Sequence, residues 1–264
     1  MERHDWLLRL FSRSVLKQAK YEHIVRLLGP TEGLSCLDIG SDNGVISYLL
    51  RQGGGGWKSA DLSEEAVQSI VDLVGSHVYQ IDGYRTPFRD EEFDRIVVVD
   101  FLEHIPDDAA FVAELDRILK SDGVLIINVP HLKSSILWRL RHAIGQTDSA
   151  HGHLRPGYTA EQLRLLLHGR MVLETYTTYT KFFSEFIDML VTCALASLKN
   201  RLDKRPRKGV MVTEAELRDH ARLFDAYSLL YPLVWLFSRM DRLLFFLSGY
   251  TLIARARKVT DTTG

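Results

Sequence analysis

The sequence has little cysteine, no excess charge of either sign and no long apolar run. Its two cysteines, Cys36 and Cys193, are too few for a disulfide framework or a cysteine-based zinc site, which predicts a cytoplasmic setting. A net charge of −1 gives no overall field to attract nucleic acid, so we expect no nucleic-acid partner. The first residues are charged, which predicts no signal peptide. Asp225 and Pro232 interrupt the longest apolar stretch, Leu223 to Phe237, so we expect no spanning helix.

Short apolar runs alternate with segments of helical periodicity along the 264 residues, of which 46% are hydrophobic. The runs expected to be strands are Leu34 to Ile39, Trp57 to Ala60, Val78 to Ile81, Phe93 to Val99, Val124 to Val129, Met171 to Tyr179 and Gly249 to Ala256. The segments expected to be helices are residues 5–28, 45–51, 63–73, 107–119, 132–144 and 159–167. Continuously apolar strands alternating with helices indicate a parallel sheet covered on both faces. We therefore predict a single α/β domain over residues 1–264, with 1–30 a helical segment and 31–181 plus 249–258 the core.

The most informative motif lies at the end of the first strand, where Asp38 is followed by Gly40-x-x-x-Gly44 and then by a helix. Glycines in such a turn let backbone N–H groups approach a nucleotide-sized ligand at the carboxyl edge of the sheet. Asp61 ends the second strand, where a carboxylate can accept hydrogen bonds from both ribose hydroxyls. Asp82-Gly83 ends the third strand, in reach of an adenine edge. Asp42 stands within the turn, and aspartate tolerates left-handed backbone better than most residues.

Further motif pieces follow in order: Thr86-Pro87-Phe88-Arg89-Asp90-Glu91-Glu92-Phe93-Asp94 and Leu102-Glu103-His104-Ile105-Pro106-Asp107. With the turn and Asp61-Leu62-Ser63, this ordered set resembles the class I S-adenosylmethionine-dependent methyltransferases, in their small-molecule branch (methyltransferase type 11, UbiG-like). The likeness covers residues 34–130 closely and 150–181 loosely. It implies a doubly wound, Rossmann-like, seven-stranded sheet, mostly parallel with an antiparallel last strand. Asp42 departs from the family, which usually has glycine there. A dinucleotide oxidoreductase would need G-x-G-x-x-G, which this turn lacks.

The resemblance implies S-adenosyl-L-methionine as cofactor, with Asp38 and the Gly40 to Gly44 turn holding its amino acid end. The full set of expected cofactor-binding residues is Asp38, Gly40, Ser41, Asp42, Gly44, Asp61, Leu62, Asp82, Gly83, Asp100 and Phe101. The chemistry would then be methyl transfer to a nucleophile aligned with the sulfonium, assisted by removal of a proton.

His104 is the expected general base, because it follows the fourth strand at the ligand-binding edge and an imidazole titrates near neutral pH. The alternative is a structural histidine at the start of a helix. Asp100, Glu103 and His104 also place oxygen and nitrogen donors at close spacing, which leaves open a bound divalent ion. No other metal site is predicted.

Several residues after the fifth strand are expected to contact the methyl acceptor. They are His131, His151, His153, Arg155 and Tyr158. In the resembling family this region helps to form the acceptor site, although ordinary loop histidines are the alternative at each position.

Residues 182–248 separate the sixth and seventh strands and read as two apolar helical segments, 182–202 and 213–247. Between them lie six cations in ten residues, Lys199 to Lys208. Apolar helices rich in aromatic residues beside a cation cluster suit an anionic membrane surface. The alternatives are a lid packed on the domain and a dimerisation hairpin, and the second would make the protein a homodimer.

We therefore predict an S-adenosylmethionine-dependent methyltransferase, peripheral on the inner face of the membrane. Its acceptor would be a small molecule, lipophilic or linked to a lipid or glycan, methylated on oxygen. One alternative is a metal-assisted quinone- or polyketide-type O-methyltransferase. Another is a non-catalytic, membrane-associated adaptor in which Asp42 has spoiled the cofactor site.

Overall fold

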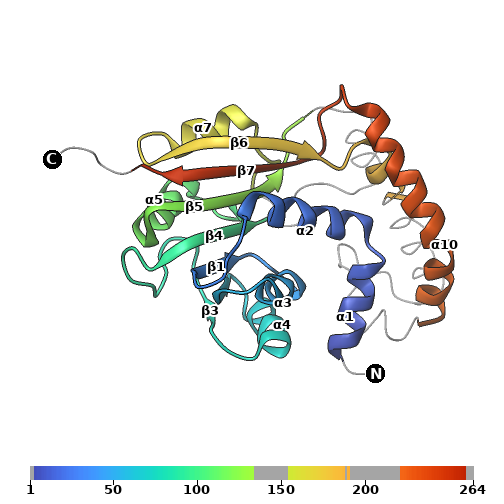
Figure 1. Ribbon diagram of the computed structural model, residues 1–264, viewed down its shortest axis with the longest axis horizontal. Helices are drawn as coiled ribbons and strands as arrows, with labels where there is room; N and C mark the ends of the chain where they lie inside the picture. The colour runs from blue at the N-terminus through green and yellow to red at the C-terminus, as the bar shows by residue number, and fades with distance from the viewer. Residues whose placement is uncertain (1–2, 134–153, 188, 191–220, 260–264) are drawn as a thin grey trace.

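The computed structural model describes residues 3–133, 154–187, 189–190 and 221–259 (Figure 1). Its strands are β1 (Ser35–Ile39), β2 (Gly56–Asp61), β3 (Val78–Gln80), β4 (Phe93–Val99), β5 (Leu119–Pro130), β6 (Met171–Tyr179) and β7 (Thr251–Lys258). They form one seven-stranded sheet in the order β3-β2-β1-β4-β5-β7-β6. β7 pairs antiparallel with both β5 and β6, and the pairs among β1 to β5 are parallel. The predicted fold class is confirmed.

The strands are apolar on both faces, because helices cover both. The helices in chain order are α1 (Arg3–Ser12), α2 (Val15–Leu28), α3 (Val45–Gln52), α4 (Glu64–Val74), α5 (Asp108–Ile118), α7 (Ala160–Leu167) and α10 (Ala221–Arg239), with the 3-10 turns η1 (Leu102–His104) and η3 (Met240–Leu244). Alternate residues of β4 pack on opposite faces of the sheet. Ile96 and Val98 share a buried cluster with Phe111 of α5, whereas Val97 and Val99 share one with α2. This is the pleat of a sheet buried on both sides.

The N-terminal segment differs from the expected single helix over residues 5–28. It forms two helices, α1 and α2, because Ser14 has an extended backbone and its side chain accepts a hydrogen bond from the N–H of Lys17. A serine in this position begins a new helix rather than continuing the old one. The break lets α2 lie against the sheet while α1 turns away from it (Figure 1). The predicted helix over 132–144 falls almost wholly outside the described residues.

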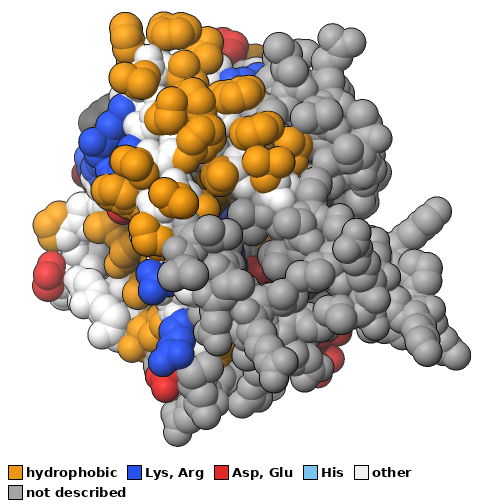
Figure 2. Space-filling view, turned by 90° about the vertical axis from the view of Figure 1, so that its right-hand side faces the viewer, with side chains coloured by type: hydrophobic (Ala, Val, Ile, Leu, Met, Phe, Trp, Pro, Cys, Tyr) orange, Lys and Arg blue, Asp and Glu red, His pale blue; other side chains and the backbone are white. Residues whose placement is uncertain are grey.

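The segment between β6 and β7 leaves and re-enters the sheet at paired residues, Tyr179 and Thr251. Its described parts are helical residues 182–187, then α10 and η3. The carboxylate of Asp241 accepts hydrogen bonds from the backbone N–H groups of Lys181 (2.7 Å) and Phe183 (2.8 Å), which joins η3 to the start of the helical residues 182–187. Hydrophobic side chains gather on the outer face of this segment (Figure 2). Among the described helices, none is both long enough and apolar enough to cross a membrane.

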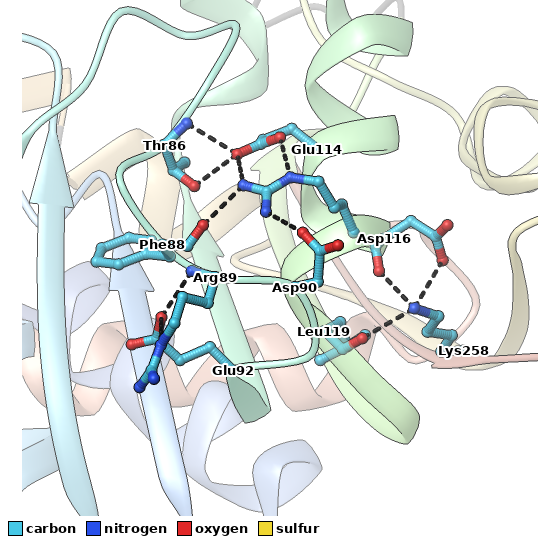
Figure 3. A network of polar contacts seen from close by, with 10 residues as sticks. Thr86, Phe88, Arg89, Asp90, Glu92, Glu114, Asp116, Leu119 and Lys258 are labelled. Carbon is cyan, nitrogen blue, oxygen red and sulfur yellow. Dashed lines mark hydrogen bonds and ion pairs between the residues drawn. The ribbon is translucent and has the colours of Figure 1, made fainter.

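A polar network fixes the loop that precedes β4 (Figure 3). Arg117 of α5 donates to Asp90 (2.5 Å) and to the carbonyl oxygen of Phe88 (2.9 Å). Glu114, on the same helix, accepts from both the N–H and the hydroxyl of Thr86, at 2.8 and 2.6 Å. The motif residues Thr86 to Asp90 are thus held against α5, and we assign them a structural role.

Candidate active site

A cavity of about 630 Å³ lies at the carboxyl edge of the sheet. One part is lined by the turn after β1 and the residues that end β2, namely Gly40, Ser41, Asp42, Asn43, Asp61, Leu62 and Ser63. Another is lined by the residues after β4 and β5 together with the ends of β6 and β7, namely Asp100, Phe101, Glu103, His104, Pro130, His131, Lys133, Tyr179, Thr180, Tyr250 and Thr251. The cavity lies where open α/β sheets bind ligands. Of the predicted cofactor-binding residues, those that line it are Gly40, Ser41, Asp42, Asp61, Leu62, Asp100 and Phe101. Among the described residues predicted to contact the acceptor, only His131 lines it.

The turn after β1 has the backbone expected of a ligand-binding glycine turn. Gly40 and Gly44 both have positive φ, at +84° and +80°, where side chains are disfavoured. A Cβ on Gly40 would collide with the carbonyl oxygen of Val99, and one on Gly44 would lie 2.8 Å from the Cα of Ile70. Asp42 has φ +54°, which is the left-handed backbone that the sequence predicted it could tolerate. Its side chain is exposed.

Asp61 supports this turn from the neighbouring strand. Its carboxylate accepts hydrogen bonds from the N–H groups of Asp42 (3.1 Å) and Leu62 (2.8 Å). The residue is buried, and burial raises the pKa of its carboxyl. A buried carboxylate at the end of β2 with capacity for further hydrogen bonds fits the predicted contact with ribose hydroxyls.

Asp38 lies beneath the turn rather than in the cavity wall. It is fully buried, and its carboxylate accepts from the hydroxyls of Ser47 and Ser59 and from Arg51. Burial raises the pKa of this carboxyl. These contacts join β1, α3 and β2, so Asp38 holds the turn from below.

Asp82 and Gly83 are not among the residues that line the cavity. The Asp82 carboxylate accepts from the N–H groups of Tyr84 (2.8 Å) and Arg85 (2.9 Å), which closes a turn at the end of β3. Gly83 has φ +78°, and a Cβ there would lie 2.7 Å from Ile105. Their contact with adenine stays a prediction.

A chain of polar contacts runs from α2 to β6 beside the cavity, and no sequence pattern indicates it. Lys20 of α2 forms an ion pair with Asp100, whose other carboxylate oxygen accepts from the side-chain amide of Asn128 at 2.8 Å. The amide oxygen of Asn128 in turn accepts from the hydroxyl of Tyr179. Burial lowers the pKa of Lys20, but the adjoining Asp100 carboxylate outweighs burial and the net pKa is raised, so Lys20 is a cation. Lys20 and Asp100 are 80 positions apart, which no local motif can connect.

His104 lies in η1, directly after β4, and lines the cavity as predicted. Arg155 and Tyr158, predicted to touch the acceptor, lie behind this turn and are not among the cavity-lining residues. Arg155 donates to the carbonyl oxygens of Ile105 (3.1 Å) and Pro106 (3.0 Å), and the Tyr158 hydroxyl donates to Asp108 at 2.8 Å. They hold the backbone that carries His104.

His131 lines the cavity and its Nδ1 lies 2.9 Å from the carbonyl oxygen of Gly249. His151 and His153 lie outside the described residues. Lys133 also lines the cavity, and it bonds the carbonyl oxygen of Ser248 while lying 4.3 Å from the centre of the Tyr250 ring. No sequence motif indicates Lys133, Tyr179 or Tyr250, because only the pairing of β7 with both β5 and β6 brings them together.

Glu103 has an unusual environment for a carboxyl group. Its residue exposure is 0%, and neither side-chain oxygen has a hydrogen-bond partner within the described part of the chain. Burial raises its pKa to about 8, the nearby Asp100 charge adds to the shift, and Lys20 opposes it. Among the described residues, no three His, Cys, Asp or Glu side chains converge so as to hold a metal ion. At neutral pH Glu103 is therefore mainly a neutral acid at the edge of the cavity.

Replacing Glu103 by glutamine tests this environment. The folded state binds the Glu103 proton more tightly than the unfolded chain, so this group's contribution to stability is greatest below about pH 4 and falls as pH rises towards 8. Glutamine cannot ionise. The unfolding free energy of the variant minus that of wild type should therefore rise by about 3 kcal/mol between pH 5 and pH 8. Urea unfolding followed by circular dichroism at both pH values measures this. Glu161→Gln, on the exposed face of α7, is the control. If the unfolding free energies of Glu103→Gln and wild type change by the same amount between pH 5 and pH 8, the assignment is contradicted.

Comparison with known proteins agrees with this geometry. Residues 37–127 match the family described as "Methyltransferase domain". This part of the chain, about a third of its length, is similar to a methyltransferase domain. The match agrees with the family resemblance found in the sequence and with the cofactor that this resemblance implies, S-adenosyl-L-methionine. The matched residues run from β1 into β5 and include the glycine turn, Asp61 and His104.

Curated relatives match a similar part of the chain at low identity. One is the "Ubiquinone biosynthesis O-methyltransferase" of Actinobacillus pleuropneumoniae serotype 5b, 24% identical over 124 residues, which are 43% of this chain and 53% of that protein. The chain spans about half the length of the curated relatives it matches.

Two solved structures show how widely the fold is used. The chain resembles the N-methyltransferase NodS from Bradyrhizobium japonicum WM9, solved with S-adenosyl-L-homocysteine, with a TM-score of 0.53 and 13% identity, over 94% of this chain and 90% of that one. It also resembles the [4+2]-cyclase SpnF, with a TM-score of 0.58 and 16% identity, over 92% of this chain and 81% of that one. A cyclase and an N-methyltransferase share the fold, so the acceptor must be argued from the site itself.

Proposed function

We propose that this protein transfers a methyl group from S-adenosylmethionine to an oxygen of a lipophilic acceptor, linked to a lipid or a glycan. The observation that carries the proposal is the shared cavity that joins the glycine turn and Asp61 to His104 and His131. Both reactants of a direct transfer must lie in one space, because the attacking atom must be aligned with the methyl group. The cavity is also walled by the aromatic side chains Tyr179 and Tyr250, which suit an acceptor with apolar surface.

The glycine turn fits the cofactor, since Gly40 lines the cavity beside Ser41 and Asp61 and holds a positive φ that brings the backbone to the cavity wall. When bound, S-adenosylmethionine supplies an activated methyl group on its sulfonium. Asp61 would hold the ribose, and the turn would hold the amino acid end. Lys20 keeps the Asp100 carboxylate paired, which limits negative charge beside the acceptor.

His104 would act as the general base in this scheme. The bound cofactor would supply the methyl group to the acceptor oxygen and keep its sulfur. The imidazole would accept the proton of the acceptor hydroxyl and release it to solvent after product leaves. Arg155 and Tyr158 would keep the imidazole in place by fixing the backbone after β4.

Peripheral association with an anionic membrane is part of the proposal, because a lipid-linked acceptor is reached at a membrane surface. The outer face of α10 and η3 exposes large apolar side chains. The basic run from Lys199 to Lys208 adds charge of the right sign in the sequence, although it lies outside the described residues.

A metal-assisted O-methyltransferase acting on a quinone or polyketide is the second candidate. Its support is the run Asp100, Glu103 and His104 and the printed name of the ubiquinone relatives. Against it, both oxygens of the Asp100 carboxylate already bond to Lys20 and Asn128. Turnover that disappears with EDTA and returns with Mg²⁺ would favour this candidate.

A non-catalytic adaptor with a degenerate cofactor site is the candidate from another class. Asp42 motivates it, since a carboxylate in the turn would repel the carboxylate of the methionine moiety. The exposed position of the Asp42 side chain reduces that repulsion.

Calorimetric titration of the full chain with S-adenosylmethionine, S-adenosylhomocysteine and NAD decides between enzyme and adaptor. We expect micromolar binding of the first two ligands and none of NAD. Absence of binding by either sulfur ligand would contradict the proposed function and favour the adaptor.

A further inference from the structure

The outer face of α10 and η3 carries a stripe of large apolar side chains at helical spacing. Leu233, Leu236, Met240 and Leu243 are all exposed, whereas Val234 and Ser238 between them are buried. The stripe continues into Phe245 and Phe246, which are 83% and 69% exposed. Figure 2 shows these elements presenting one broad field of hydrophobic side chains. A contiguous field of this kind marks a surface that contacts an apolar partner rather than water.

The stretch of chain that carries this apolar face is more basic than acidic. Residues 231–250 contain two cations, Arg239 and Arg242, and one acid, Asp241. The carboxylate of Asp241 is taken up by backbone N–H groups at the start of the helical residues 182–187. The Arg239 guanidinium lies 4.5 Å from the centre of the Trp235 ring. Arginine beside tryptophan at the edge of an apolar face is the arrangement favoured at the headgroup level of a membrane.

The same face is attached to the wall of the cavity. Lys181 donates to the carbonyl oxygen of Leu244 at 2.7 Å, and Lys133 donates to that of Ser248. Lys133, Thr180 and Tyr250 line the cavity. The apolar residues of η3 and Phe245 to Leu247 thus lie within a few residues of the acceptor part of the site.

From these observations we propose that residues Leu243 to Leu247, at and just after the end of η3, insert into the surface of an anionic lipid bilayer and turn the acceptor part of the cavity towards it. This rests on the proposed function, in that it names where a lipid-linked acceptor would be presented. Arg239 and Arg242 would lie at the phosphates, and Phe245 and Phe246 among the upper acyl carbons. The acceptor then reaches His104 from the membrane side rather than from bulk water.

Sedimentation of the full chain with vesicles of phosphatidylcholine, with and without 30% phosphatidylglycerol (about one anionic lipid in three), tests the proposal. We expect the double variant Phe245→Ser/Phe246→Ser to bind anionic vesicles about tenfold more weakly than wild type. The matched control is Leu165→Ser/Val172→Ser, which removes two exposed apolar side chains, 67% and 57% exposed, from α7 and the far end of β6. It should bind as wild type does. Arg239→Gln/Arg242→Gln should weaken binding to anionic vesicles only.

Three results would overturn the proposal. The first is a wild-type protein that sediments with vesicles of neither composition. The second is wild-type binding that the loss of both phenylalanines leaves unchanged. The third is a wild-type dimer that Phe245→Ser/Phe246→Ser makes monomeric, which would assign the face to a second copy of the chain. Calorimetric binding of S-adenosylmethionine without lipid is measured on each variant, so that a failed membrane site is distinguished from a failed methyltransferase.

Discussion

Replacing Asp61 by alanine is expected to weaken S-adenosylmethionine binding by about 10- to 100-fold. Two effects combine. The carboxylate supports the glycine turn through the N–H groups of Asp42 and Leu62, and it is the group placed to accept from the ribose hydroxyls. Hydrogen bonds to a charged group are each stronger than neutral ones, so losing two of them is costly. The dissociation constant is measured by calorimetric titration of the purified variant.

Two further variants separate these effects. Asp61→Asn keeps an oxygen for the turn but lacks the charge, so we expect an intermediate loss of affinity. Asp72→Ala removes an exposed carboxylate of α4 that bonds to Gln68 and is not among the cavity-lining residues, and we expect affinity within about threefold of wild type. An Asp61→Ala protein that binds the cofactor as tightly as wild type would remove the ribose assignment.

Replacing His104 by glutamine is expected to lower turnover by about 10²- to 10⁴-fold while leaving cofactor affinity nearly unchanged. Glutamine keeps a polar side chain of similar reach but cannot accept the acceptor's proton. Methyl transfer from radiolabelled S-adenosylmethionine to a catechol and to a polyprenyl-linked monosaccharide in detergent micelles provides the rate. Calorimetry provides the affinity.

His168→Gln is the matched control, because His168 caps the end of α7 and is not among the cavity-lining residues. It should retain wild-type turnover. Full activity of His104→Gln would end the candidacy of His104 as base and direct attention to Glu103. A parallel loss of turnover and cofactor affinity would instead indicate that His104 supports the turn after β4.

Much of the sheet could be predicted from the sequence because its signals are local. The run from Ile96 to Val99 is continuously apolar because α2 and α5 cover the two faces of β4. Gly40 and Gly44 stand where the turn needs positive φ, which glycine adopts without strain. The left-handed backbone at Asp42 is also compatible with the sequence, because aspartate is one of the few residues with a side chain that tolerate it.

The rest of the site depends on contacts between distant segments. Lys20 stands in an amphipathic helix with no motif, and only the packing of α2 on the sheet brings it to Asp100. Arg155 and Tyr158 looked like acceptor contacts because their loop follows β5. The structure shows their polar atoms bonded to the turn that carries His104. The division of residues 5–28 was missed because the apolar spacing continues across Ser14.

The pairing of Tyr179 with Thr251 has a consequence for how this chain can change over evolutionary time. The segment from Thr180 to Tyr250 joins two paired residues of neighbouring strands, so the sheet itself holds the two ends of the segment close together. Lengthening such a loop from about five residues to about seventy costs only about 2 kcal/mol of closure entropy, because the cost grows with the logarithm of length. The segment can therefore be lengthened, shortened or exchanged while the sheet and the cofactor turn stay intact. Since Tyr179 and Thr251 also border the cavity, such an exchange can alter the wall of the cavity without altering the turn after β1.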